Sequence, residues 1–428
     1  MAGSWKLNIA VASFLAFSIY LGFGMILPIF PNYVDLLGGG GFEVGLLLAS
    51  FMFTRAFLAR PFGKLSDRIG RKKVIITGMF LYGMLAFLFT LPDNWWGLIL
   101  VRVLQGTASA MVWPVGEALV VDSAPPSKMS RSISVYMFLT NIGIVAGPLV
   151  GGIILFISQD VAGFSELTAM RTPFYFTSTI AFVAAFFGLI FLKDKLTVVK
   201  DLKMQKDKED RASKGIGKKI RISLNMLYAN SFFEGFSWSL GSVVLFFFME
   251  QNFGIGARDF SILFGAGMGI GLLFVLPTGY LTEGPHKKPV IVHSSVWGRY
   301  STIVLSLSPL LPFGRMISIL TFVGKDIGRQ VSLPATRALQ AEIVPTRIRG
   351  RLIATIQAIS NIGATIGPIL GGLIWDLTHE RDYSLVFMDL PGYSIPFLIS
   401  SFFGILAALL VQRFVHEPKR KEKKDTPN

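Results

Sequence analysis

The sequence contains no cysteine, only four histidines and only 16% charged residues. Without cysteine the chain can form neither a disulfide framework nor a thiolate metal site, and its histidines lack the paired spacing of a zinc centre. It also lacks a P-loop, and no nucleophile stands at a fixed spacing from a base. Soluble proteins carry about 25% charged residues. We therefore expect neither an enzyme nor a bound metal or other cofactor, and we do not expect a soluble domain.

Apolar residues are abundant instead. They make up 52% of the 428 residues, and the mean hydropathy is +0.57. A helix needs about 20 mostly apolar residues to cross a bilayer. Such stretches lie near residues 9–30, 43–62, 74–91, 95–121, 133–157, 173–192, 222–249, 259–281, 289–311, 315–341, 352–375 and 394–414. The first stretch is too long for the apolar region of a signal peptide. The sequence therefore predicts an all-α membrane protein with twelve transmembrane helices.

The connections between these stretches differ in charge from one side to the other. Connections on the side of the N-terminus hold thirty Lys and Arg residues, whereas those on the opposite side hold four. Because cytoplasmic loops carry an excess of Lys and Arg, we expect a multi-pass protein of the cell membrane with both termini in the cytoplasm. Topology then accounts for the net charge of +15. We expect the lipid bilayer, and not nucleic acid, as a partner.

The two halves of the chain resemble each other. Residues 141–152 read NIGIVAGPLVGG and residues 361–372 read NIGATIGPILGG, at an offset of 220, while segment 63–73 is echoed by 279–289 at an offset of 216. We expect two pseudo-symmetric six-helix bundles at 1–192 and 222–414, a charged linker at 193–221 and a basic tail at 415–428. The linker is either a solvated tether or a partly helical segment on anionic headgroups. Two like halves permit alternating access to a midplane site.

The connection after the second stretch carries the pattern G-x-x-x-D-R-x-G-R-K. Its residues are Gly63, Asp67, Arg68, Gly70, Arg71 and Lys72. Glycine lets a tight loop sit on a helix end, and an Asp can cap a helix N-terminus and pair with Arg. The pattern indicates a charge lock on the cytoplasmic face that can break. The alternative is a loop that only follows the positive-inside rule.

Two further patterns lie within membrane stretches. The fourth stretch holds Arg102, Gln105 and Gly106, and an Arg at this depth is costly unless it faces protein or water. The fifth stretch contains G-x-x-x-G-P-x-x-G-G, whose fixed residues are Gly143, Gly147, Pro148, Gly151 and Gly152. Small residues allow close helix packing and proline kinks a helix. A packing role without any part in coupling is the alternative.

These patterns, together with LGFGMILPIFPNY at 21–33, resemble the major facilitator superfamily over essentially the whole chain. The first stretch is similar to the twelve-helix drug–proton antiporters, although Ser134 stands where the antiporter pattern usually has a further glycine. The resemblance implies the superfamily's fold, a monomer, and export of small hydrophobic molecules in exchange for protons. It assigns Arg102 to proton relay or gating. The gate would contain Gly63, Asp67, Arg68, Gly70, Arg71, Lys72, Asp122, Arg131, Glu283, Glu342 and Arg351.

Three carboxylates at membrane depth are candidates for proton coupling, namely Glu234, Asp326 and Glu117. Glu234 stands near the middle of its stretch, and Asn230 and Trp238 share its helix face. Burial disfavours a charged carboxylate and so favours proton uptake; competition between a proton and a cationic substrate then gives antiport. No cation lies within a helical turn of Glu234. Asp326 is either a proton site or a structural partner of a neighbouring cation.

Basic residues outnumber acidic ones within the predicted spans. An excess of positive charge suits an anionic solute, so a transporter of an organic or phosphorylated anion is the main alternative. A receptor or scaffold without transport is a second alternative, which the gate patterns in both halves argue against. We expect the substrate cavity to contain Tyr20, Gln105, Trp113, Asn230, Trp238, Arg299, Lys325, Arg329, Gln357 and Asn361.

Overall fold

The computed structural model describes residues 4–125, 128–193, 218–275, 277–278, 287–343, 349–384 and 389–416. Several expected features lie outside these residues. They are most of the linker at 193–221, Glu283 of the predicted gate, and most of the tail at 415–428. The side chain of Arg351 lies outside the description as well.

Twelve long helices in the described residues correspond to the twelve apolar stretches. They are α1 (Ser4–Ile26), α3 (Gly41–Ile69), α4 (Arg71–Leu88), α5 (Trp95–Ser123), α6 (Met129–Phe156), α7 (Glu166–Phe191), α9 (Lys218–Phe253), α10 (Ala257–Leu273), α12 (Lys287–Leu307), α13 (Gly314–Ile343), α14 (Arg349–Thr378) and α15 (Ile395–Phe414). Eight of them are long and apolar enough to cross a membrane by length and composition alone. Helix α13 is not among the eight, and Lys325, Asp326 and Arg329 stand at its middle.

Short elements join some of these helices. Helix α2 (Phe30–Asp35) follows α1, and a π-helical turn (Ile157–Val161) extends α6. Strands β1 (Asp382–Ser384) and β2 (Asp389–Pro391) pair antiparallel, with Tyr383 opposite Leu390. The apolar pattern gave no sign of this hairpin, because each strand has only three residues.

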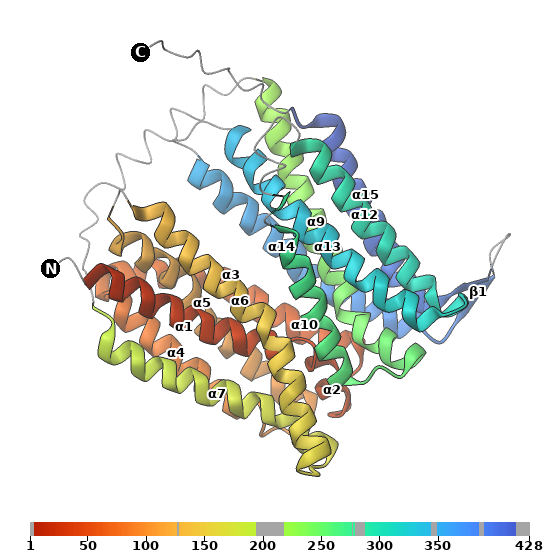
Figure 1. Ribbon diagram of the computed structural model, residues 1–428, viewed down its shortest axis with the longest axis horizontal. Coiled ribbons are helices and arrows are strands. Elements are labelled where there is room, and N and C mark those ends of the chain that lie inside the picture. Colours follow the sequence, from red (N-terminus) through yellow and green to blue (C-terminus); the bar gives the residue numbers. More distant parts are fainter. Residues whose placement is uncertain are drawn as a thin grey trace. The chain divides into compact units, whose positions relative to one another are not determined.

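The chain forms two compact units. Unit 1 contains residues 1–200, 239–269 and 364–396, and unit 2 contains 201–238, 270–363 and 397–428. In unit 1, α1 packs against α6 and α7, and α3 packs against α5 (Figure 1). Unit 1 thus combines the first six long helices with parts of α9, α10 and α14. The bundles expected at 1–192 and 222–414 rest on the sequence repeat and stay a prediction.

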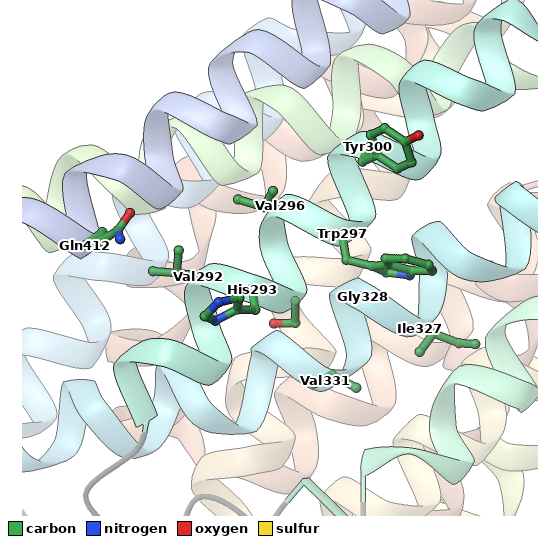
Figure 2. A pocket seen from close by; sticks show the side chains of 10 residues that line it. Val292, His293, Val296, Trp297, Tyr300, Ile327, Gly328, Val331 and Gln412 are labelled. Carbon is green, nitrogen blue, oxygen red and sulfur yellow. The ribbon is translucent and has the colours of Figure 1, made fainter.

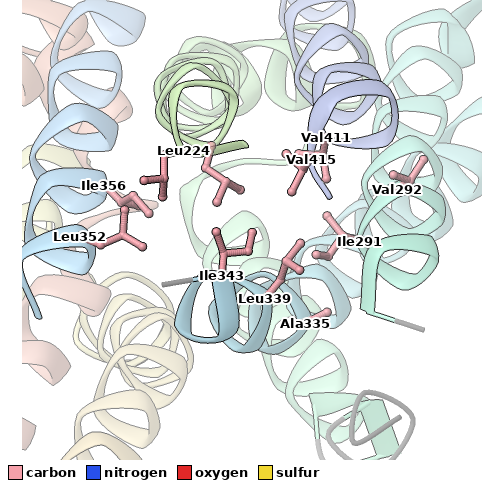
Figure 3. Close-up of a cluster of buried hydrophobic side chains, with 11 residues drawn as sticks. Leu224, Ile291, Val292, Ala335, Leu339, Ile343, Leu352, Ile356, Val411 and Val415 are labelled. Atoms are coloured by element: carbon pink, nitrogen blue, oxygen red, sulfur yellow. The ribbon is translucent and has the colours of Figure 1, made fainter. Parts of the chain in front are cut away.

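In unit 2, α12 packs along α13, and one end of the unit is closed by an apolar cluster. Figure 3 shows Leu224 of α9, Leu339 of α13 and Val411 of α15 turned toward one another. Ile291 of α12 and Ile356 of α14 complete the contact between five helices. Lipid tails are as apolar as these side chains, so van der Waals packing holds the helices together here. The cluster therefore holds together the helices that carry the charged residues described below.

Candidate functional site

A single glycine connects α3 to α4. Gly70 has φ 100° and ψ 142°, a conformation that residues with a Cβ rarely adopt. Arg71 follows directly, and its guanidinium lies 3.1 Å from Asp67 of α3 and also pairs with Asp122 near the end of α5. Glycine at this turn therefore places Arg71 between two carboxylates from two different helices.

An equivalent ion pair is present in unit 2. The Lys287 Nζ lies 3.1 Å from the Glu342 Oε2. The offset of 220 relates Glu342 to Asp122, and the offset of 216 relates Lys287 to Arg71. Each half of the chain thus holds a basic–acidic pair at an equivalent pair of helix ends.

The structure also describes Lys72, Arg68, Arg131 and Gly63 of the predicted gate. Lys72 donates to the Leu189 carbonyl at 2.7 Å. Arg68 lies in the last turn of α3, and Arg131 is exposed on α6. A Cβ at Gly63 would meet no atom within 4 Å. In this structure the loop pattern is therefore organised around Arg71.

The other end of α3 is capped by a residue that is distant in the sequence. Asp376 of α14 accepts hydrogen bonds from the backbone N–H groups of Gly41 at 3.0 Å and Phe42 at 2.7 Å. The first N–H groups of a helix lack internal partners and carry partial positive charge, so a carboxylate there is stabilising. A side chain at Gly372 would collide with the Gly41 carbonyl. The sequence around Asp376 does not indicate that this residue caps α3.

The glycine pattern on α6 is a packing surface with two faces. A Cβ at Gly143 would lie 2.7 Å from the Phe17 carbonyl oxygen, and one at Gly147 would lie 2.6 Å from that of Leu21, both on α1. A Cβ at Gly152 would instead lie 2.8 Å from Ile262 of α10. The motif residues Gly151 and Pro148 belong to the same helix, and Gly151 also contacts α1 at Met25. The close packing expected for this pattern is present, and any part of it in coupling stays a prediction.

Arg102 is held inside unit 1 by aromatic rings and one amide. It is 4% exposed, and its Nη1 donates to the Gln105 side-chain oxygen at 2.8 Å. Its guanidinium carbon lies 3.9 Å from the Phe30 ring centroid and 5.0 Å from that of Phe89. A cation over a ring face is attracted by the ring quadrupole, and more strongly when water is absent. No carboxylate of the described residues pairs with Arg102.

An aromatic stack adjoins this region of unit 1. The rings of Tyr20 and Trp113 lie 4.5 Å apart and are nearly parallel, at 6°. The guanidinium of Arg55 lies 3.8 Å from the Trp113 ring. Glu117, one turn further along α5, is exposed. Tyr20 and Trp113 are expected cavity residues, whereas sequence spacing does not indicate Arg55, because its ring partner lies on another helix.

Glu234 has a cationic partner from another helix. The Arg299 Nη2 donates to the Glu234 Oε2 at 2.7 Å, and the two side chains are 12% and 35% exposed respectively. A side chain at Gly404 of α15 would collide with the Arg299 guanidinium group. No cation lies within a helical turn of Glu234 in the sequence, and its cationic partner comes from α12 instead.

Three charged residues stand at the middle of α13. Asp326 is 8% exposed, and its buried Oδ2 accepts no hydrogen bond from the described residues. Neither Lys325 nor Arg329 forms an ion pair with it within 4 Å in the described part of the chain. The Arg329 guanidinium lies 4.0 Å from the Trp238 ring, and Lys325 and Arg329 interact electrostatically with Asp326 and with each other. Asp326 is thus a buried carboxyl that lies near cations and has no direct partner among the described residues.

The remaining expected cavity residues are distributed over unit 2. Arg337 donates to the Gln357 side-chain oxygen at 3.1 Å, and Gln357 donates to Asn361 at 3.1 Å. Asn230 is buried on α9, at 6% exposed. Gln357 and Asn361 thus form a hydrogen-bonded pair of amides on α14.

A groove on unit 2 does not contain any of the expected charges. It is lined mainly by α12 and α13 side chains, including Val296, Trp297, Tyr300 and Ile327, with Gln412 from α15 (Figure 2). Trp297 and Tyr300 are both more than half exposed.

Among the described residues, no group of three His, Asp or Glu side chains could hold a metal ion.

Comparison with known proteins places this chain in a family. A family model described as Major Facilitator Superfamily matches residues 12–325 and 227–428. The chain is 27% identical to the quinolone resistance protein NorA of Staphylococcus aureus, over 91% of this chain and 95% of NorA. It is 24% identical to multidrug resistance protein 2 of Bacillus subtilis, over 84% and 87%.

A solved structure shares the fold. It is a bacterial homologue of the human lysosomal transporter Spinster, with a TM-score of 0.76, 15% identity, and 97% and 98% of the two chains covered. The sequence resemblance and the expected twelve-helix fold are confirmed. This chain is a multi-pass membrane protein and belongs to the Major Facilitator Superfamily of transporters.

Proposed function

We propose that the protein is a secondary active transporter that exports small hydrophobic molecules in exchange for protons. The observation that carries this proposal is Asp326, a buried carboxyl at the middle of α13 whose Oδ2 has no hydrogen-bond donor among the described residues. A buried charged carboxylate without a direct partner is costly, so such a group binds a proton or a cation readily. Asp326 is therefore our first candidate for the residue that binds the coupling proton. Glu234 is the second candidate, because Arg299 already pairs with it.

Aromatic faces in both units support hydrophobic substrates. Tyr20 and Trp113 form a stack in unit 1, and Trp238 lies beneath Arg329 in unit 2. Aromatic rings offer large, rigid apolar surfaces that accommodate flat ring systems in several orientations. The names of NorA and of the Bacillus subtilis relative refer to drug resistance, which supports drug-like molecules as the substrate class.

Ion pairs at helix ends support alternating access. We propose that Arg71 with Asp67 and Asp122, and Lys287 with Glu342, are parts of the cytoplasmic gate that exchange partners during transport. The acidic partners Asp67 and Glu342 are 34% and 47% exposed, so water can solvate these carboxylates when the pairs break. The cap that Asp376 provides to α3 is our candidate for the gate at the opposite side.

The experiment that tests this proposal uses the purified full-length protein in liposomes. A pH gradient is imposed, and movement of two dyes is followed: neutral Nile red and ethidium, a permanent cation. We expect gradient-driven movement of at least one dye, loss of that movement when a protonophore collapses the gradient, and proton flux when dye is added. Dye movement that does not respond to the gradient, or no movement of either dye, would overturn proton-coupled export.

A second candidate function is transport of an organic or phosphorylated anion. Arg55, close to Trp113 in unit 1, adds to the excess of cations at membrane depth. The sign of the coupling separates the two functions. A cation competes with a proton for a carboxylate, which gives antiport, whereas an anion binds better when the carboxylates are protonated, which gives symport. A monoanionic dye that enters liposomes together with protons would favour this second candidate.

Orientation and oligomeric state belong to the same proposal. We propose that both termini are cytoplasmic and that the protein works as a monomer. Because the sequence has no cysteine, single cysteines can be introduced before Lys6 and into 64–73, and also into the hairpin at 382–391. Labelling of intact cells with an impermeant maleimide should modify only the hairpin position. Modification of the other two would reverse the orientation.

A further inference from the structure

Arg299 occupies the carboxylate that a cationic substrate would otherwise use. Glu234 is 35% exposed and stands near the middle of its apolar stretch, where a hydrophobic cation could reach it. Its Oε2 already accepts a hydrogen bond from the Arg299 Nη2 at 2.7 Å. A charge-assisted bond of this length is among the stronger ones in proteins. A cation must therefore displace a guanidinium before it can pair with Glu234.

The neighbouring helices hold Arg299 in this position. Gly404 of α15 has no side chain, and any Cβ there would collide with the Arg299 guanidinium. Ser401, nearly one turn earlier on α15, donates to the Arg299 carbonyl oxygen at 3.3 Å. The Arg299 side chain is only 12% exposed, so water does not compete strongly for it. The absence of a side chain at Gly404 thus opens the path along which Arg299 reaches Glu234.

The charges around this pair also disfavour an added cation. Arg329 interacts electrostatically with Glu234, Arg299 and Asp326, and Lys325 interacts with Arg299 and Asp326. Three cations thus face two carboxylates within unit 2. At membrane depth such charges act through a low dielectric and are weakly screened. With one carboxylate taken by Arg299, a permanently cationic substrate meets an environment of net positive charge.

We propose that Arg299 is a specificity-determining residue, a tethered cation that competes with cationic substrates for Glu234 and so biases the site toward neutral drug-like molecules. This inference rests on the proposed transport function. A purely structural role for Arg299 would not predict that removal of its charge increases the affinity for cations. A site with Glu234 unoccupied would accept hydrophobic monocations more tightly than the natural site does.

The test measures ethidium binding to the purified full-length protein at pH 8 by fluorescence anisotropy. We expect Arg299→Gln to lower the Kd for ethidium about tenfold, and Arg299→Gln combined with Glu234→Gln to lose this gain. Arg299→Lys keeps a cation beside Glu234, so its Kd should stay near that of the wild type. Arg315→Gln removes the same charge from the exposed start of α13 and serves as the matched control, with no change expected.

Gly404→Ala provides an independent variant, because it leaves every charge in place. The new methyl group would overlap the Nε, Cδ and Cζ atoms of Arg299, so this side chain must move from its present position. We expect the move to weaken its pair with Glu234, so the Kd for ethidium should fall as it does in Arg299→Gln. Thermal melting of each variant confirms that it is folded. Should Arg299→Gln fail to fold, Gly404→Ala and Arg299→Lys decide the question.

The ethidium Kd tests the competition by Arg299, and dye movement tests the proposed function, so either can fail without the other. An ethidium Kd that is the same in the wild type and in a folded Arg299→Gln or Gly404→Ala protein overturns the competition by Arg299. An equal gain in Arg315→Gln overturns it too, because the effect would then be one of net charge. Gradient-driven dye movement by the wild type tests the proposed function, whatever the affinities are.

Discussion

Helices α5 and α13 occupy equivalent places in the two halves of the sequence and handle buried charge in opposite ways. In α5, Arg102 is 4% exposed, lies over the Phe30 ring and bonds to Gln105 within its own helix. The offset of 220 places Phe322 at the position of Arg102 and Lys325 at that of Gln105. The charge is thus moved along by about one turn, and a carboxyl, Asp326, stands beside it.

This contrast between α5 and α13 indicates which charges can change partners. Arg102 is fixed by ring faces and one amide, which cannot bind or release a proton near neutral pH. In unit 2, Glu234 and Arg299 pair with each other, and Asp326 has no direct partner among the described residues, so these charges can form new pairs. We therefore propose that proton coupling takes place in unit 2 and that the Arg102 cluster of unit 1 has a structural role.

The largest expected effect comes from removing the carboxyl of α13. Asp326→Asn keeps the size of the side chain but removes its ability to bind and release a proton. Gradient-driven dye movement in liposomes should fall about a hundredfold, in the range that loss of a positioned proton-transfer group produces, while dye binding is retained. The control is Asp382→Asn in the exposed strand β1, which should leave movement unchanged. Full coupling in Asp326→Asn would remove the contrast between the helices.

The next effect concerns stability in unit 1. Arg102→Leu should lower the free energy of unfolding by about 2 kcal/mol, because a desolvated cation–π contact is lost and Gln105 is left without its donor. Measurement is by thermal melting of the detergent-solubilised protein. Arg102→Lys, which keeps the charge but not the planar guanidinium, should be intermediate. If Arg102→Leu melted normally but lost proton coupling, Arg102 would belong with the exchanging charges instead.

A smaller effect is expected at the start of α3. Asp376→Asn leaves an oxygen to accept one hydrogen bond but removes the negative charge from the helix N-terminus, at a cost of about 1 kcal/mol. The melting temperature should fall, and more so than in Glu380→Gln, which removes an exposed charge just beyond α14. Equal shifts in the two variants would mean that the cap carries no particular weight.

The smallest effect concerns Asp35, at the end of α2 and outside the spans. Partial burial, and secondarily the negative charge of Glu166, raise the pKa of Asp35. A raised pKa means that the folded state prefers the protonated form of Asp35. The charged carboxylate therefore destabilises the folded protein fully above the raised pKa. This cost decreases as the pH falls through the raised pKa and is absent below the pKa of the unfolded chain. Asp35→Asn should therefore raise the melting temperature slightly at pH 7 and leave it unchanged below about pH 4. The same increase at both values would contradict this origin.

The twelve helices and the turn at Gly70 follow from the sequence alone. Both depend on local properties: the length of an apolar stretch that a bilayer requires, and a backbone conformation that glycine adopts readily. The repeat between the halves also predicted equivalent gate positions, and the pairs Arg71–Asp122 and Lys287–Glu342 lie at them.

The pairing of the charges, in contrast, depends on how the helices pack. Sequence spacing predicts contacts within one helix, at three or four residues, and cannot predict a partner on another helix. Glu234 pairs with Arg299, which lies 65 positions later in the sequence. Asp376 caps a helix that begins 335 positions earlier. Asp326, which stands directly beside Lys325 in the sequence, forms no ion pair with it among the described residues. Adjacent side chains on a helix diverge, so packing between helices settles whether a buried charge is paired or left available for a proton.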